Sequence, residues 1–222
     1  MHIVNSIAGF MQEGGFFMYP ILLVLALGLA IAIERFLYLS STKSSNIKTW
    51  KEMLPLIEKG KFGEATNLAA DSSAAVGKIL AYGLSRLKSS QQRDRIETAM
   101  EEGLMEIVPR LEKRTHYLAT FANISTLLGL LGTVTGLIEA FAAVANADPA
   151  QKAELLSASI SVAMNCTAFG LGTAIPLMLL YSFLQSKTTE LVDSLEMVSV
   201  KFLNILQEQP AQPQVGGDGN AA

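Results

Sequence analysis

Threonine residues recur inside two long apolar stretches of this 222-residue chain. In the first stretch, 118–144, Thr126 and Thr133 are seven residues apart and so lie on nearly the same face of a helix. A polar group in hydrocarbon without a partner costs free energy, which gives a lipid-facing helix no reason to carry such hydroxyls. We therefore expect part of this helix to face other protein or water. Its other candidate residues are glycines, which let helices approach closely: Gly129, Gly132 and Gly136.

The second stretch, 160–184, repeats this mixture of hydroxyl and small residues. Thr167 and Gly170 share a helix face, and Asn165 lies nearby with an amide that a backbone carbonyl alone cannot satisfy. Two interpretations remain open. The hydroxyls either bond to carbonyls four residues earlier in tightly packed helices, or they line a passage through the membrane.

Residues suited to catalysis or to metal binding are not arranged for either purpose. The chain has two histidines, His2 and His116, neither of them within an apolar stretch, and its one cysteine, Cys166, excludes an internal disulfide. No serine lies in a nucleophile motif. We expect no enzymatic activity, no cofactor and no metal site.

Acidic residues are almost missing from the two stretches. Only Glu139 lies within the apolar part, two turns before an outer loop, and we interpret it as an interfacial acid near the outer rim. A proton pathway needs a titratable group near the middle of the membrane. If protons cross here, we expect another polypeptide to supply the carboxylate.

Composition places the chain among membrane proteins, because half of its residues are hydrophobic and only 17% are charged. We predict an all-α membrane protein with three transmembrane helices and long cytoplasmic helical extensions. The predicted segments, in order, are an amphipathic segment 1–13, transmembrane helix 14–38, cytoplasmic helical domain 39–117, transmembrane helix 118–145, periplasmic loop 146–159, transmembrane helix 160–184, cytoplasmic helix 185–207 and a disordered tail 208–222.

Helical periodicity continues outside the membrane. One helix in 91–117 is expected to present an apolar stripe whose members are three or four residues apart: Ile96, Met100, Leu104, Ile107 and Leu111. Apolar residues from Ile47 to Ile57 predict one amphipathic helix, which Pro55 should kink or interrupt. No cluster of turn residues separates 91–117 from the second span, so the sequence is compatible with one long helix from Gln91 to Val144, bent at Pro109.

Basic residues set the expected orientation. Fourteen of the 17 Lys and Arg residues lie between Arg35 and Arg114, whereas residues 1–34 have none. The positive-inside rule places this segment and the C-terminus in the cytoplasm and the N-terminus outside. Acidic residues are interspersed among the bases, and no nucleic-acid-binding motif accompanies them, so we expect no nucleic-acid partner.

Two motifs in this order resemble the MotA/TolQ/ExbB proton-channel family, closest to its ExbB and TolQ branch. They are GLLGTVTGLIEAF, from Gly129 to Phe141, and ISVAMNCTAFGLGTAIPLMLLYS, from Ile160 to Ser182. The resemblance covers about residues 14–207. It implies a ring-shaped homo-oligomer, a pentamer, around single-span partners of the ExbD or TolR type that carry a transmembrane aspartate.

The resemblance also implies roles for particular residues. Thr133 and Thr167 match hydroxyls that face the partner's aspartate, and Pro176 matches the proline of the third span. We expect Thr126 and Asn165 to complete the polar lining, and Gly129, Gly132, Gly136, Gly170 and Pro176 to serve helix packing. One position departs from the family pattern, since Val162 stands where ExbB and TolQ usually have glutamate.

The expected function is that of a proton-channel subunit in the bacterial inner membrane. With its partner, a TonB-like protein and membrane lipids around it, such a subunit would power TonB-dependent transport or another envelope process. A TolQ-type or gliding motor, or a scaffold that conducts no protons, are the alternatives that the sequence leaves open.

Overall fold

The structure is a computed structural model that describes residues 15–87, 89, 92–145 and 147–208. The expected amphipathic segment 1–13 and all but the first residue of the expected tail 208–222 lie outside these residues. Within them every regular element is a helix, and the order is α2 (Met18–Glu58), α3 (Phe62–Asp71), α4 (Ala75–Leu87), α5 (Arg93–Glu112), α6 (Thr115–Ala145) and α7 (Lys152–Glu208). The all-α class is confirmed.

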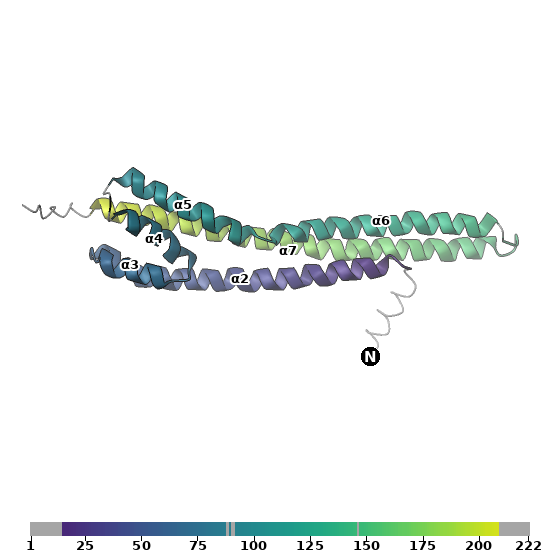
Figure 1. Ribbon diagram of the computed structural model, residues 1–222. Coiled ribbons are helices and arrows are strands. Elements are labelled where there is room, and N and C mark those ends of the chain that lie inside the picture. Colours follow the sequence, from purple (N-terminus) through teal and green to yellow (C-terminus); the bar gives the residue numbers. More distant parts are fainter. Residues whose placement is uncertain (1–14, 88, 90–91, 146, 209–222) are drawn as a thin grey trace, which may run out of the picture. The chain divides into compact units, whose positions relative to one another are not determined.

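The chain divides into two compact units. Unit 1 contains residues 1–39 and 112–188, and unit 2 contains residues 40–111 and 189–222. Helices α2 and α7 contribute residues to both (Figure 1).

In unit 1, three helices lie side by side (Figure 1). The α6 and α7 helices are antiparallel, because Gly136 faces Ala163 while Gly129 faces Gly170. The α2 and α7 helices are parallel, because Gly15 lies beside Val162 and Gly28 beside Leu177. Small side chains thus mark the contacts that bring the three backbones together.

The outer faces of these helices carry large apolar side chains that are mostly exposed. Ile138 of α6 is 63% exposed and Leu179 of α7 is 67% exposed. Three helical segments among the described residues are long and apolar enough to cross a membrane, at Met18–Glu58, Arg93–Ala145 and Lys152–Glu208. A surface of this kind is stable in lipid and unfavourable in water. The protein is a multi-pass membrane protein.

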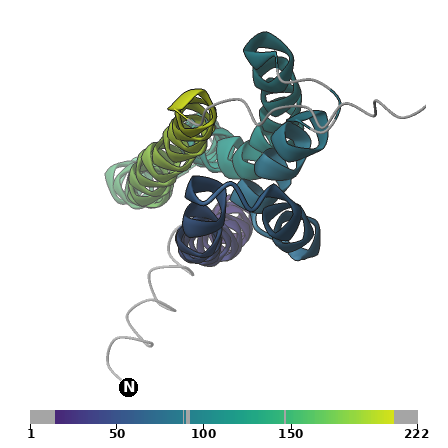
Figure 2. The same cartoon turned by 90° about the vertical axis from the view of Figure 1, so that its left-hand side faces the viewer.

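In unit 2, short and long helices share one apolar core, and Figure 2 shows them from the end. The expected stripe of α5 is buried at Ile96, Met100, Ile107 and Leu111. From α7, Phe202 is fully buried and its ring lies close to Gly83 of α4. The other large core side chains of this unit include Met53, Ile57, Ile79, Leu80, Leu84 and Leu195.

Polar side chains of α2 hold the start of α4. The first N–H groups of a helix have no partner within it, and Val76 solves this by donating its N–H to Asn46 Oδ1 at 3.3 Å. The Ala74 N–H is donated to Ser72 Oγ at 3.2 Å, and that hydroxyl lies 3.4 Å from Thr49 Oγ1. Asn46 and Thr49 are buried for this reason, although both are polar.

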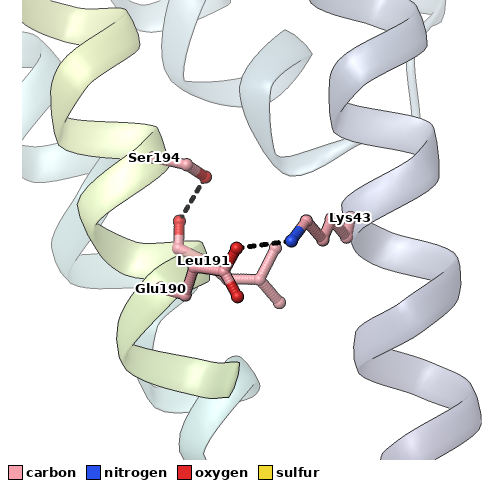
Figure 3. A network of polar contacts seen from close by, with 4 residues as sticks. All are labelled: Lys43, Glu190, Leu191 and Ser194. Atoms are coloured by element: carbon pink, nitrogen blue, oxygen red, sulfur yellow. Dashed lines mark hydrogen bonds and ion pairs between the residues drawn. The ribbon is translucent and has the colours of Figure 1, made fainter. Parts of the chain in front are cut away.

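One ion pair joins α2 to α7 in unit 2. Lys43 Nζ lies 2.5 Å from Glu190 Oε1, and Ser194 Oγ donates to the Leu191 carbonyl one turn further along α7 (Figure 3). Both charged side chains are about half exposed, so the pair contributes at most about 1 kcal/mol.

The helix α2 corrects two sequence-based expectations. It is unbroken through Pro55, which lies in its last turn and neither interrupts nor ends it. The buried face near its end agrees only in part with the apolar pattern from Ile47 to Ile57, since Ile57 and Met53 are fully buried whereas Ile47 is 48% exposed. The contacts with α4 decide this face, and they involve the polar residues Asn46 and Thr49 that an apolar pattern overlooks.

The single long helix from Gln91 to Val144 that the sequence allows is interrupted between α5 and α6. The chain leaves the helical conformation at Lys113 and Arg114, between α5 and α6, and Arg114 has a φ of 68°. In unit 1 the Arg114 guanidinium lies 3.5 Å from the Glu34 carboxylate. The expected separate loop 146–159 is shorter as well, because α7 begins at Lys152 after a turn in which Asp148 Oδ1 accepts the Ala150 N–H at 3.1 Å.

Candidate functional site

The candidate site lies in unit 1, where the backbones of α6 and α7 approach each other closely. A Cβ atom placed on Gly129 would be 3.2 Å from the Thr167 Cα atom and 3.3 Å from the Cys166 carbonyl oxygen. One placed on Gly170 would be 2.7 Å from the Ser125 carbonyl oxygen. The two glycines therefore allow a backbone-to-backbone contact that any side chain would prevent.

Two threonine hydroxyls meet at this contact. Thr133 Oγ1 donates to the Gly129 carbonyl at 3.1 Å, and Thr167 Oγ1 donates to the same oxygen from the other helix at 2.9 Å. The two hydroxyls are also hydrogen-bonded to each other. The close approach at Gly129 is what brings Thr167 within reach of a carbonyl on α6.

The two hydroxyls have fewer protons to donate than there are hydrogen-bond contacts between them and the Gly129 carbonyl. Each hydroxyl has one O–H to donate and two lone pairs to accept with, so two protons serve three contacts. At any moment one hydroxyl donates to the other or both donate to Gly129, and these arrangements interchange by rotation of the O–H bonds. The pair keeps free lone pairs in each arrangement. Because Thr133 and Thr167 are half-buried, those lone pairs can accept a hydrogen bond from a group that approaches from outside.

Two other threonines of α6 follow the ordinary pattern of a packed helix. Thr126 Oγ1 donates to the Ala122 carbonyl at 3.2 Å, and Thr135 Oγ1 donates to the Leu131 carbonyl at 2.9 Å. Thr126 is exposed, and among the described residues no hydrogen bond joins it to the Thr133–Thr167 pair. It is therefore open to surroundings outside this chain.

The remaining candidate residues are spread over the two helices. Gly132 lies against Cys166 Sγ, and Gly136 lies against Ala163, so both glycines are at the same α6–α7 contact as Gly129 and Gly170. Pro176 is exposed within an unbroken α7.

Two polar residues stand apart from the hydroxyl pair. Asn165 is half-buried, and no hydrogen bond within the described residues involves its side chain. Glu139 is exposed, less than two turns before α6 ends at Ala145. Val162, at the position where the family usually has glutamate, is 37% exposed and lies beside Gly15.

Cys166 is buried against Gly132, which fits the interpretation of this cysteine as a small helix-packing residue. Sequence reasoning missed the place of Ser125, which is fully buried with no protein partner for its hydroxyl among the described residues. Counting helical positions from Gly129 would have placed Ser125 on the contact face, since it is four residues earlier.

A model of the MotA/TolQ/ExbB proton channel family matches residues 71–197, which is more than half of the chain. The chain belongs to this family. The match includes all of α6 and the part of α7 up to residue 197, which lies beyond the apolar stretch 160–184.

Individual relatives support the same assignment. The chain is similar to an ExbB homologue of Methanothermobacter thermautotrophicus, with 29% identity over 202 residues that cover 89% of this chain and 70% of the relative. It is 32% identical over 111 residues to the biopolymer transport protein ExbB of Aquifex aeolicus, covering 50% of this chain and 72% of that protein. Over 111 residues it is 32% identical to the Tol-Pal system protein TolQ of Haemophilus influenzae, covering 50% of this chain and 48% of that protein. The chain is thus a membrane subunit of the ExbB/TolQ type.

Proposed function

We propose that this protein is the proton-channel subunit of an energy-transducing motor in the bacterial inner membrane. Five copies would form a ring around a single-span partner of the ExbD or TolR type. Proton flow would then power a TonB-dependent or another envelope process. The N-terminus is assigned to the periplasm and the C-terminus to the cytoplasm, in line with the distribution of basic residues.

The Thr133–Thr167 pair is the observation that carries this proposal. A hydroxyl pair anchored on the Gly129 carbonyl holds its lone pairs in a fixed place inside a membrane span. Such lone pairs can accept a hydrogen bond from a protonated carboxyl of the partner, which stabilises its neutral form in a medium of low dielectric constant. When the carboxyl loses its proton, a hydroxyl can rotate and donate to the carboxylate instead. Thr126 and Asn165 are proposed to extend the polar path.

The chain itself has no carboxylate for this task in the described part of its spans. Glu139 is exposed and close to the end of α6, and Val162 occupies the position of the family's usual glutamate. The proposal therefore assigns the titrating acid to the partner and only the hydroxyl wall to this subunit.

Replacing one hydroxyl by a methyl group tests this role. Thr133→Val and Thr167→Val keep the side-chain shape and remove the O–H, and we expect each to abolish partner-dependent envelope work. Thr135→Val is the matched control, because Thr135 bonds only to carbonyls of its own helix and should retain wild-type activity. Assembly is measured by the mass of the purified complex. Full activity of both Thr133→Val and Thr167→Val would refute the role assigned to the pair.

A second candidate function follows from the same hydrogen bonds. Because both threonine hydroxyls are already bonded within the chain, they could serve helix packing alone, in a scaffold that holds a partner without conducting protons. Loss of the hydroxyl would then lower stability without a change in proton flux. A scaffold predicts no flux under any condition, with or without the partner.

A further inference from the structure

Two aromatic rings from different helices stack in unit 1. Phe36 of α2 and Phe183 of α7 have ring centroids 6.3 Å apart and ring planes inclined by 21°. The side chains are 44% and 50% exposed, so the outer faces and edges of the pair are open to the surroundings of the chain.

The ammonium group of Lys187 lies over this pair. Its Nζ atom is 5.4 Å from the Phe36 ring centroid and 5.2 Å from the Phe183 ring centroid, which is within the range of a cation–π attraction. No carboxylate among the described residues forms an ion pair with Lys187. The rings hold the ammonium in place without using its N–H donors, which remain for an anion.

The three residues mark one level of the membrane. Phe36 follows the end of the first apolar run at Ile33 by three residues, and Lys187 follows the end of the third at Leu184 by three residues. Since α2 and α7 are parallel, both runs end at the same height. Aromatic and basic side chains concentrate at this boundary because one part of each side chain prefers hydrocarbon and the other prefers water.

Lys187 is the basic group that an anion at these rings can reach. Arg35, next to Phe36 in the sequence, is buried with its guanidinium 4.8 Å from the Tyr38 ring centroid. Two acids close in sequence are already paired, since Glu190 on α7 pairs with Lys43 and Glu34 on α2 pairs with Arg114 at 3.5 Å.

We propose that Phe36, Phe183 and Lys187 bind the headgroup of an anionic phospholipid at the membrane surface where the helical extensions emerge. The Lys187 ammonium donates to a phosphate oxygen, and the exposed ring surfaces contact the glycerol and the first methylenes of the acyl chains. A lipid fits better than a free phosphate ion, because half-exposed aromatic rings at the end of an apolar run offer a surface that only an amphipathic ligand covers.

Native mass spectrometry of the full-length protein in detergent tests this site. Phosphatidylglycerol and phosphatidylcholine with identical acyl chains are titrated separately. We expect the wild type to prefer phosphatidylglycerol. Lys187→Gln should weaken the binding of this lipid by about fivefold, which is the effect of one basic residue near an anionic surface. Lys187→Arg should retain the preference. Lys78→Gln, which changes an exposed lysine of α4, is the control and should bind both lipids as the wild type does.

Several results would overturn the site. These are equal binding of both lipids by the wild type, a loss in Lys187→Gln no larger than in Lys78→Gln, or inorganic phosphate that competes as strongly as the lipid. Phe36→Leu supplies a second check, because it keeps apolar area but removes one ring face under the ammonium, and it should also reduce the preference. Circular dichroism verifies that each variant keeps its helix content. None of these results depends on proton transport.

Discussion

At the scale of single residues, two threonine hydroxyls share one backbone carbonyl as their hydrogen-bond acceptor. The Gly129 oxygen accepts hydroxyls from both α6 and α7, so Thr133 and Thr167 act as one unit rather than as two separate polar positions. The sequence predicted the two threonines and the glycines around them. It did not predict the shared carbonyl, because that depends on how closely the two backbones approach at Gly129 and Gly170.

Gly170→Ala is expected to lower stability despite the better helix propensity of alanine. The new Cβ atom would lie 2.7 Å from the Ser125 carbonyl oxygen and 3.0 Å from the Gly129 Cα atom, and backbone cannot yield as a flexible side chain can. We expect a loss of about 1–3 kcal/mol in the free energy of unfolding, measured by denaturation in detergent.

The matched control for this change is two residues further along α7. A Cβ atom on Gly172 would meet nothing within 4 Å, so Gly172→Ala should be neutral or should stabilise by up to about 1 kcal/mol through helix propensity. Equal effects of the two substitutions would contradict the tight α6–α7 contact.

A tyrosine outside the spans provides a pH-dependent prediction. Tyr82 of α4 donates its hydroxyl to Glu106 Oε2 at 2.8 Å, and this hydrogen bond, together with the negative charge of Glu106, raises the pKa of Tyr82. The folded pKa lies above the unfolded one, which is about 10. The resulting stability is therefore present below about pH 10 and is lost as the pH rises through the raised pKa.

Absorbance of tyrosinate measures this shift. In a titration, the difference between the wild type and Tyr82→Phe isolates Tyr82 from the four other tyrosines of the chain. Glu106→Gln removes the negative charge and should move the titration of Tyr82 toward lower pH. An unchanged titration in Glu106→Gln would show that Glu106 is not the cause.

At the scale of elements, the break between α5 and α6 is the feature that the sequence did not predict. Residues 110–120 contain no glycine, proline or asparagine, which are the usual signals for a break, and Pro109 lies inside α5. Arg114 nevertheless adopts a φ of 68°, a conformation that costs a residue with a side chain about 1 kcal/mol or more. Its ion pair with Glu34 offsets part of this cost. Such a tertiary contact is invisible to local sequence patterns.

Substitutions of Arg114 distinguish the energetic cost of its backbone conformation from the contribution of its ion pair with Glu34. Arg114→Gly relieves the backbone cost but loses the ion pair, so we expect a change within about 1 kcal/mol. Arg114→Val loses the ion pair and also places a β-branched residue at positive φ, so it should destabilise the protein by more than Arg114→Gly. Thermal unfolding followed by circular dichroism compares the two. Valine tolerated as well as glycine would contradict the left-handed conformation.

At the scale of the whole molecule, the two units differ in where their apolar side chains lie. Unit 1 exposes leucines and isoleucines suited to lipid and contains the Thr133–Thr167 pair, whereas unit 2 buries an apolar core beneath charged helices. Apolar run length predicted the three spans, and helical periodicity predicted the core face of α5. The buried face of α2 in unit 2 was predicted only in part, because two of its members are polar: Asn46 contacts Val76 of α4 and Thr49 contacts Ser72.

Proton flux into liposomes tests the central claim most directly. The protein is reconstituted with its single-span partner, and the internal pH is followed with a dye after a membrane potential is imposed. We predict a flux that requires the partner and its transmembrane aspartate, that is lost in Thr133→Val and in Thr167→Val, and that persists in Thr135→Val. A partner-dependent flux that survives the simultaneous loss of both hydroxyls would contradict the proton path proposed for this protein.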